Sequence, residues 1–325
     1  MLIYKKIVLK RFNGMKEIGG YIELDTFRGK MLYDNGIKLN CGRNALAYVI
    51  KAKKIRNILM PKFMCDSCDL IFKQNNVNVR YYSIGLDFNP ILEEQLADEW
   101  LYVVNFYGQV CIQDILNNFK RVICDNAQAY FQEPLKGVDT LYTCRKFFGV
   151  SDGAILYTDK KLENLPIDES HDRMHFLLGR YEKSASEFYN EYVANNDFFE
   201  YEPIKLMSRL TNNILHGIDY EYVKNRRTEN FTYLNEKLFS VNKLQLKIPQ
   251  GAFMYPLYVN NGGVLRKKLQ ERKIYIPILW PSVFAICTDD ELEYDMAKNI
   301  LPLPVDQRYS LEDMKYLVDC ILKLI

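Results

Sequence analysis

The stretches Val122-Ile-Cys-Asp-Asn-Ala-Gln128 and Thr140-Leu-Tyr-Thr-Cys-Arg-Lys146 decide the fold of this 325-residue chain. Each opens with a short apolar run typical of a buried strand, and each soon meets a charged residue, Asp125 in the first and Lys146 in the second. In open α/β sheets, ligands bind at the carboxyl ends of the strands. The two charged side chains are therefore candidate functional residues, although Asp125 would also suit a helix N-cap and Lys146 a solvated turn.

Short apolar runs alternate with amphipathic segments between residues 40 and 160. This alternation predicts an α/β fold, in which a mainly parallel sheet lies between helices. The chain after residue 165 is expected to be helical. The expected strands are 57–61, 79–84, 101–106, 122–124, 140–143 and 154–158, and helices are expected from Gly42 onward and over 112–119.

A second, smaller α/β unit is indicated toward the C-terminus. Strand-like runs occur at Pro249–Val259 and Lys273–Ile278, and Ser310 with Asp313 forms the cap of a final amphipathic helix. We therefore expect a large domain, including the N-terminal segment, over residues 1–215 and a small C-terminal domain over residues 216–325.

Composition and charge exclude several classes of protein. The chain is 48% hydrophobic, which suits a full core and excludes disordered and fibrous classes. Lys and Arg total 43 against 41 Asp and Glu, so the net charge of +2 gives no field that would gather nucleic acid or an anionic membrane. The longest apolar stretch, Tyr275–Cys287, is interrupted by prolines, and the N-terminus lacks the pattern of a signal peptide. We expect a cytoplasmic protein with no nucleic-acid or membrane partner.

The eight cysteines do not form a disulfide framework in a chain of this length, and several lie inside apolar runs where a reduced thiol packs as a small hydrophobe. Cys65 and Cys68 form a Cys-x-x-Cys pair that could hold zinc or carry redox chemistry. The chain has no second such pair and only three histidines, so we expect no metal.

Polar residues that directly follow the apolar runs form a candidate site. A helix beginning at Gly42-Arg43-Asn44 would add backbone N–H groups that suit a phosphate. An anion cradle, a carboxylate and an amine are the groups that pyridoxal phosphate demands. Asp125 would keep the pyridine nitrogen protonated, and Lys146 would bind the aldehyde and move a proton as general base. The candidates at the strand ends are Asn105 with Tyr107, Asp125 with Gln128, and Thr143 with Lys146.

From about residue 17 to the C-terminus, the sequence resembles the sugar aminotransferases of the DegT and StrS type, which have the fold type I of pyridoxal-phosphate enzymes. The order of the motifs carries the resemblance. Cys41-Gly-Arg-Asn-Ala-Leu46 resembles the family's phosphate-binding Ser-Gly-Thr-x-Ala-Leu. The other motifs follow in the family's order. They are Met60-Pro61, Asn105-Phe-Tyr-Gly108, Asp125-Asn-Ala-Gln128, and Thr143 and Lys146 with Asp152-Gly-Ala154.

The resemblance implies a function and a set of site residues. Lys146 would hold pyridoxal phosphate as a Schiff base, and an amino group would pass from an amino acid, with glutamate as the expected donor, to a keto-sugar that is nucleotide-linked, in polysaccharide biosynthesis. Lys146 and Asp125 would be catalytic. The cofactor would contact Gly42, Arg43, Asn44, Cys65, Asp125, Gln128, Thr143 and Lys146. A homodimer is implied as well.

Three departures from the family pattern leave alternatives open. The family's stacking aromatic falls at Cys65, so stacking is lost or passes to a neighbour such as Phe63. Thr143 lies three residues before Lys146, whereas the family's phosphate-binding hydroxyl lies about five before it. The Asn-Tyr-Arg motif expected near Met207-Ser208 is absent. The alternatives are a non-catalytic or regulatory paralogue, or another cofactor chemistry such as sugar dehydration.

Three further side chains receive structural interpretations. Arg226 and Arg227 lie on an expected helix, where a solvated basic face is the simplest account of two adjacent arginines. Trp280 lies in an apolar run and is expected in the core.

Overall fold

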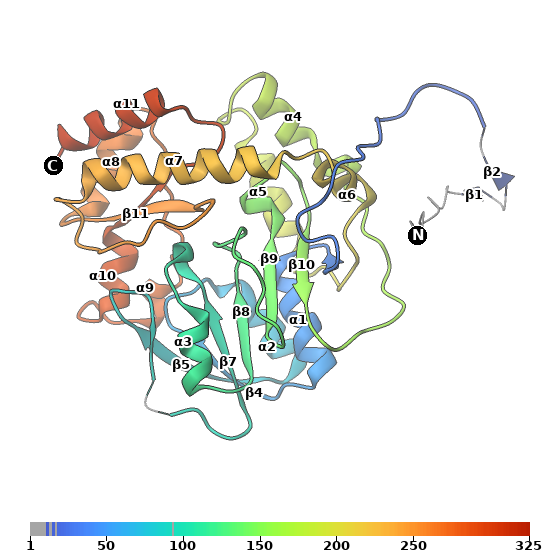
Figure 1. The fold of residues 1–325 in the computed structure, drawn as a ribbon, viewed down its shortest axis with the longest axis horizontal. Helices are drawn as coiled ribbons and strands as arrows, with labels where there is room; N and C mark the ends of the chain where they lie inside the picture. Colours follow the sequence, from blue (N-terminus) through green and yellow to red (C-terminus); the bar gives the residue numbers. More distant parts are fainter. Residues whose placement is uncertain (1–10, 13–14, 17, 93) are drawn as a thin grey trace.

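The computed structural model describes residues 11–12, 15–16, 18–92 and 94–325 (Figure 1). Its centre is a sheet of eight strands in the order β3-β10-β9-β8-β7-β4-β5-β6. The five strands from β9 to β5 run parallel, whereas β3, β10 and β6 join by antiparallel pairing. The strands are β3 (Ile37–Leu39), β4 (Asn57–Pro61), β5 (Asn78–Ile84), β6 (Pro90–Ile91), β7 (Glu99–Val104), β8 (Val122–Asp125), β9 (Asp139–Thr143) and β10 (Ala154–Tyr157).

Helices cover the sheet on both faces, with α1 and α2 behind it and α3 in front in the view of Figure 1. A short hairpin of β1 (Arg11–Phe12) and β2 (Met15–Lys16) lies away from the body. No helix in the described ranges is long and apolar enough to cross a membrane. The helices are α1 (Gly42–Lys53), α2 (Asp69–Asn75), α3 (Ile112–Asn118), α4 (His175–Glu182), α5 (Tyr189–Phe198), α6 (Arg209–Leu215), α7 (Tyr220–Leu238), α8 (Gly262–Glu271), α9 (Val283–Ile286), α10 (Leu292–Asn299) and α11 (Leu311–Leu322).

The α/β class and the strand positions predicted for the large sheet are confirmed. One strand end was wrong, because β7 stops at Val104 instead of continuing to Phe106. Asn105 leads instead into a 3-10 turn, η2 (Phe106–Gly108), in which Tyr107 takes the left-handed conformation with φ 52°. The chain therefore turns sharply at this strand end.

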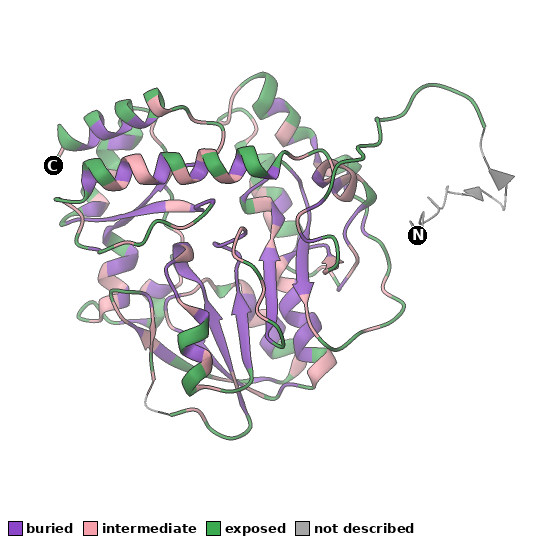
Figure 2. Ribbon diagram, viewed as in Figure 1, coloured by how far each residue is buried: buried purple, intermediate pink, exposed green. Residues whose placement is uncertain are grey.

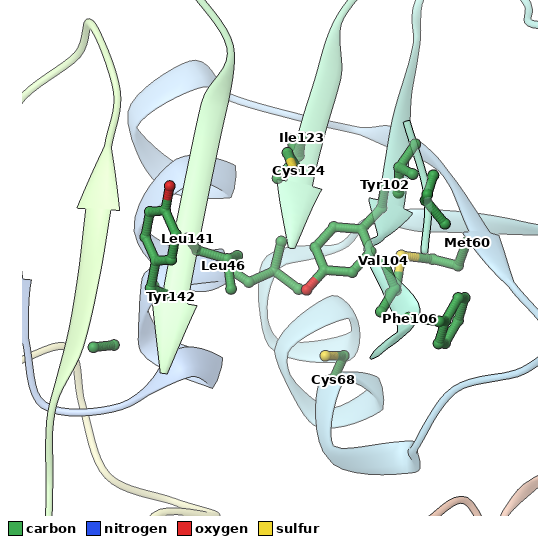
Figure 3. Packing of buried hydrophobic residues seen from close by; sticks show 14 of the residues in the cluster. Leu46, Met60, Cys68, Tyr102, Val104, Phe106, Ile123, Cys124, Leu141 and Tyr142 are labelled. Atoms are coloured by element: carbon green, nitrogen blue, oxygen red, sulfur yellow. The ribbon is translucent and has the colours of Figure 1, made fainter. Parts of the chain in front are cut away.

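The central strands are buried on both faces because helices pack on each side of them (Figure 2). All four residues of β8 are buried, and so are Leu101 to Val104 of β7. Figure 3 shows Tyr102, Val104, Ile123 and Cys124 from these strands among Leu46, Met60 and Cys68. The sheet is therefore a rigid base for the loops that leave its strand ends.

The C-terminal part contains a two-stranded antiparallel sheet of β11 (Met254–Tyr258) and β12 (Ile300–Pro304). The predicted strand at Lys273–Ile278 was wrong. That segment has no strand: Lys273 adopts φ 61°, and Pro277 lacks a backbone N–H. The strand β12 was missed because its two prolines argue against a strand, yet each strand of a two-stranded sheet has a free edge that tolerates proline.

A second hydrophobic core, made of residues between 231 and 321, joins this small sheet to helices α7, α8 and α11. The predicted boundary between residues 215 and 216 stays a prediction. The predicted cap of the last helix is present: the Ser310 hydroxyl accepts from the Asp313 N–H, and the Asp313 carboxylate accepts from the Ser310 N–H at 2.8 Å.

The capping box gives a stability prediction. We expect Ser310→Ala to lower the free energy of unfolding by about 1 kcal/mol, because the variant loses a hydrogen bond to an N–H that the helix itself cannot satisfy. Urea denaturation measures the change. Ser240→Ala, in the exposed turn after α7, is the control and should be neutral. Equal stability of the two variants would contradict a contribution from the cap.

Candidate functional site

Asp125 is a carboxylate buried at the end of a central strand. Its side chain is 7% exposed, and its oxygens accept from the Tyr102 hydroxyl and the Ala127 N–H, both at 2.7 Å. Burial raises the pKa of Asp125 above its ordinary value, and the charge of Lys146 and the two hydrogen bonds partly offset this rise. The carboxylate is thus held rigidly where a cationic partner would stabilise its charge.

Lys146 lies one strand away, at the end of β9. It closes the 3-10 turn η3 (Cys144–Lys146), and its side chain is exposed. Because β8 and β9 pair in parallel with Asp125 opposite Leu141, the two strand ends share one edge of the sheet. The Lys146 ammonium lies 5.5 Å from the centre of the Phe253 ring. The structure therefore places the amine and the buried carboxylate at neighbouring strand ends.

The start of α1 lies against the end of β9. A Cβ built on Gly42 would lie 2.7 Å from the Thr143 Oγ1, so a larger residue at this position would displace the Thr143 hydroxyl or the start of the helix. The backbone N–H groups of Asn44 and Arg43 interact with the Cys41 thiol, but burial dominates and raises the pKa of this thiol to about 11. The structure thus brings the predicted phosphate cradle and Thr143 together.

The Asn44 side chain has a structural task. Its amide donates to Asn40 Oδ1 at 3.0 Å and to the Pro203 carbonyl at 2.8 Å, which fastens α1 to the segment before α6. The predicted phosphate contact of Asn44 would therefore have to come from its backbone N–H, which in this structure interacts with the Cys41 thiol. Arg43 is half-buried, and its charge acts on Cys41 and Cys68.

Gln128 is buried, and its carbonyl oxygen accepts from the Tyr107 N–H at 3.0 Å. This bond supports the left-handed turn after β7. Asn105 also supports that turn, since its oxygen accepts from the Val110 N–H at 3.1 Å. The structure therefore shows that Gln128 stabilises the turn through a hydrogen bond, whereas its predicted contact with the cofactor stays a prediction.

Cys65 is half-buried in the loop after β4, with its sulfur 2.9 Å from the Ser67 hydroxyl. Phe63 cannot replace it as a stacking side chain. Its ring is fully buried, 4.2 Å from Trp280 between ring centres, and Trp280 lies in the core as predicted.

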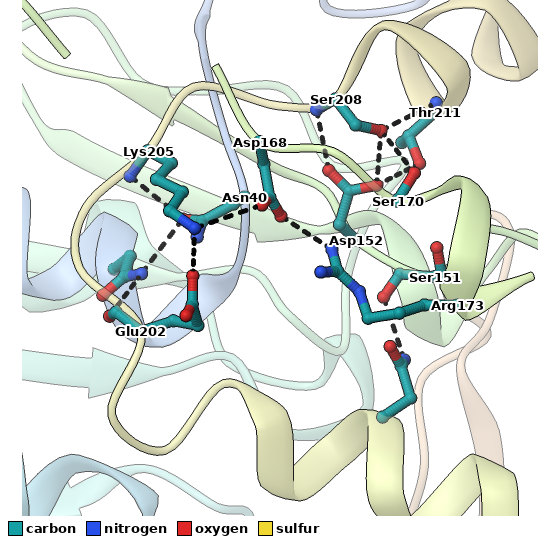
Figure 4. Close-up of polar contacts among 12 residues, drawn as sticks. Asn40, Ser151, Asp152, Asp168, Ser170, Arg173, Glu202, Lys205, Ser208 and Thr211 are labelled. Atoms are coloured by element: carbon teal, nitrogen blue, oxygen red, sulfur yellow. Dashed lines mark hydrogen bonds and ion pairs between the residues drawn. The ribbon is translucent and has the colours of Figure 1, made fainter. Parts of the chain in front are cut away.

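The segment around Met207-Ser208, where the Asn-Tyr-Arg motif was expected, is hydrogen-bonded to Asp152 of the same chain (Figure 4). The buried Asp152 carboxylate accepts from the Ser208 N–H and hydroxyl, both at 2.8 Å, and from the Thr211 hydroxyl. Gly153 follows with φ 117°, a conformation that favours glycine. This network fixes the turn between η3 and β10 and therefore supports the backbone near Lys146.

Two residues near the site were missed from the sequence. Tyr102 lies in an apolar strand and looked like a core residue, yet its hydroxyl holds Asp125. Arg227 was predicted on a solvated basic face, which was wrong, because its side chain is fully buried. Only Arg226 is partly exposed, in an ion pair with Glu229. Without the positions of neighbouring segments, no local signal separates the two arginines.

One grouping of potential metal ligands occurs in the described part of the chain, Cys287 with Glu291 and Glu293. Sequence reasoning did not find it. Its carboxylates already have partners, since Glu291 pairs with Lys62 and Glu293 accepts from the Ile84 N–H at 2.9 Å. The grouping is explained by these contacts.

Solved structures of other proteins identify the fold. No family model and no curated protein sequence matches the chain. The solved structure of the sugar aminotransferase CalS13 from Micromonospora echinospora matches with a TM-score of 0.59 at 14% identity, over 88% of this chain and 86% of that one. A DegT DnrJ EryC1 StrS aminotransferase from Brucella abortus matches with a TM-score of 0.60 at 14% identity, over 89% and 85%.

A third similar structure is NtdA from Bacillus subtilis, solved with bound cofactor PMP. It matches with a TM-score of 0.62 at 14% identity, over 88% of this chain and 72% of that one. At this level of identity the agreement concerns the path of the backbone. The chain has the fold of the DegT and StrS type aminotransferases, the fold type I predicted from its motifs.

Proposed function

We propose that this protein is a pyridoxal-phosphate-dependent aminotransferase that moves an amino group from an amino acid to a keto-sugar. The observation that carries the proposal is the position of the Lys146 amine and the buried Asp125 carboxylate at neighbouring strand ends, beside the start of α1. The shared fold supports it, because two of the similar structures are of aminotransferases and the third, NtdA, contains the cofactor PMP. Glutamate as donor, a nucleotide-linked acceptor, a role in polysaccharide biosynthesis and a cytoplasmic location belong to the same proposal.

The residues present fit pyridoxal phosphate. Asp125 is buried with a raised pKa, so its charged form gains from a cation such as a protonated pyridine nitrogen. The close approach of Gly42 to Thr143 leaves the backbone of the first α1 turn near a hydroxyl, which suits a phosphate. Lys146 is exposed and so can reach an aldehyde.

Each residue would have a separate task in the reaction. Bound pyridoxal phosphate would supply an aldehyde for the amine and a ring that withdraws electrons. Asp125 would hold a proton on the ring nitrogen through a charge-assisted hydrogen bond, and Tyr102 would hold Asp125. The Lys146 Nζ, once released by the donor amine, would accept a proton from the substrate carbon and return it at another atom. Gln128 would keep the turn at Tyr107 in place.

A non-catalytic or regulatory paralogue is the second candidate. It is favoured by Cys65 at the stacking position, by the full burial of Phe63, and by the hydrogen bonds that tie Ser208 to Asp152 of its own chain. Such a protein would bind the cofactor without turnover. Dehydration of a sugar is a further alternative, and product analysis separates it from transamination.

We also propose a homodimer. Residues 18–24 extend from the body of the chain, and Ile18, Tyr21 and Ile22 are each at least 88% exposed. The base of this arm is fixed, because the Phe27 N–H donates to Asn213 Oδ1 at 2.9 Å. Apolar side chains held away from their own core gain stability by packing on a second copy. The segment from about 175 to 201 is a second candidate for contact across the dimer.

Lys146→Ala should abolish the visible absorbance that the protein gains with pyridoxal phosphate, because the variant lacks the amine that binds the aldehyde. Borohydride reduction and peptide mapping of the unaltered protein should place the adduct on Lys146. Lys136→Ala is the control and should retain the absorbance. An adduct on Lys136 or Lys160 would refute the assignment.

Asp125→Asn tests the carboxylate. Since burial raises the pKa of Asp125 above its ordinary value of 3.8, the cofactor-free protein should lose stability as the pH rises from 3.8 through the folded value. We expect the variant to lack this loss in urea denaturation. It should also bind the cofactor more weakly by about 1.5 to 3 kcal/mol and transaminate poorly. Near-normal transamination would show that another group meets the ring nitrogen.

Light scattering should give about twice the chain mass of 38.3 kDa. The double variant Tyr21→Ser with Ile22→Ser should shift the protein toward the monomer, because it removes apolar contact from the arm. Tyr275→Ser, which changes an exposed tyrosine of the C-terminal part, is the control. A stable monomer of the unaltered protein would refute the proposed homodimer.

A further inference from the structure

Arg227 is a buried cation with no carboxylate in salt-bridge distance among the described residues. The hydrogen bonds of its guanidinium all go to neutral oxygens, and the charge of Asp306, beside Gln307, acts on it from beyond salt-bridge distance. The Nε donates to Gln307 Oε1 at 2.7 Å, one Nη donates to the Ala252 and Phe253 carbonyls at 3.0 and 3.3 Å, and the other donates to the Phe147 carbonyl at 3.2 Å. Burial lowers the pKa of Arg227 to about 10, so it stays charged at neutral pH.

Two of these acceptors adjoin Lys146. Phe147 follows Lys146 in the chain, and its carbonyl receives a second hydrogen bond from Gln307 Nε2 at 2.8 Å. The Phe147 ring lies under the guanidinium, 4.6 Å from its central carbon. Phe253 supplies the ring against which the Lys146 ammonium lies at 5.5 Å. One side chain therefore fixes both the backbone that carries the lysine and the ring that the lysine touches.

Three of the four acceptors belong to the C-terminal part of the chain. Ala252 and Phe253 precede β11, and Gln307 follows β12, whereas Phe147 belongs to the loop after β9. Burying a guanidinium is costly, and an apolar side chain of similar length would fill the same space at a lower cost. An apolar side chain has no hydrogen-bond donor, so it could not hold the Phe147 carbonyl and the carbonyls of the C-terminal part at fixed distances.

We propose that Arg227, together with Gln307, is a positioning residue for Lys146, which it fixes through the Phe147 carbonyl and the Phe253 ring. This inference rests on the proposed role of Lys146 as the cofactor-binding amine. It also makes the C-terminal part a determinant of the geometry of an amine carried by the large sheet. The role is distinct from stabilising the fold, because it predicts a change at one lysine.

The test uses Arg227→Met, Arg227→Lys and Gln307→Met, with Arg226→Met as matched control on the same helix. The first readout needs no cofactor. An amine-reactive reagent labels the cofactor-free protein, and peptide mass spectrometry gives the rate at Lys146 relative to Lys237 on α7. In the Arg227 and Gln307 variants this ratio should rise about two- to fivefold, the factor that corresponds to a lost cation–π contact at an exposed site.

The second readout is the rate at which pyridoxal phosphate forms a borohydride-trappable adduct on Lys146. It should fall at least about tenfold in Arg227→Met, because misplaced reacting groups meet less often in a productive geometry. Arg227→Lys keeps the charge but cannot reach four acceptors, so it should resemble Arg227→Met. If the Arg227 variants do not fold, Gln307→Met still tests the proposal, because it removes the second hydrogen bond to the Phe147 carbonyl.

The outcomes separate the two proposals. If the unaltered protein forms the adduct but the labelling ratio in the Arg227 and Gln307 variants equals that of Arg226→Met, the positioning role is refuted and the proposed function stands. If the ratio responds but the unaltered protein forms no adduct, the proposed function fails and the positioning of Lys146 stands. A lower melting temperature with an unchanged ratio would mean that Arg227 only stabilises the fold, which also refutes the inference.

Discussion

The rest of the site depends on a carboxylate buried at the end of a central strand. Taking Asp125 out of water is costly, and two hydrogen bonds and the nearby Lys146 charge offset that cost only in part. The parallel pairing of β8 with β9 brings the Lys146 amine to the same edge of the sheet. A bound cation would complete the arrangement, and for this reason the geometry favours a cofactor with a protonated ring nitrogen.

The surroundings of this pair are built to hold backbone in place. Gln128 braces the left-handed Tyr107, and Asp152 ties the turn before β10 to the start of α6. Arg227 and Gln307 do the same for the Phe147 carbonyl from the C-terminal side. Four polar side chains, of which Gln128, Asp152 and Arg227 are buried, thus hold the loops at this edge of the sheet. Full hydrogen bonding lets such groups specify one arrangement of loops that apolar contacts alone would leave variable.

The departures from the family pattern have different structural consequences. Asp152 holds the segment that lacks Asn-Tyr-Arg within its own chain, so the fold does not require that motif. The position of the stacking aromatic is held by Cys65, and Phe63 beside it belongs to the core under Trp280. These two features bear on how a cofactor would be bound, whereas Asp125 and Lys146 bear on the proposed reaction. Cofactor binding and turnover can therefore be tested separately.

Much of the large sheet could be predicted from local pattern. Short apolar runs that end in polar residues, such as the one before Asp125, mark buried parallel strands, because a strand covered on both faces needs apolar side chains throughout. Strand polarity then places Asp125 and Lys146 at one edge. The C-terminal sheet was harder, because β12 contains two prolines and pairs only with β11. The prolines of β12 argue against a strand, whereas residues 273–278, which follow α8, were predicted to form one.

The sequence by itself determined the α/β class, the position of Asp125 and Lys146 after predicted strands and the cap at Ser310, since these follow from the period of the apolar residues and from contacts within a few residues. Tertiary structure decided the roles of Tyr102, Arg227 and Gln307. A tyrosine in a strand and an arginine on a helix look alike whether they face solvent, core or a functional loop. Their partners lie 23 and 80 residues away for Tyr102 and Arg227, so only the folded chain brings donor and acceptor together.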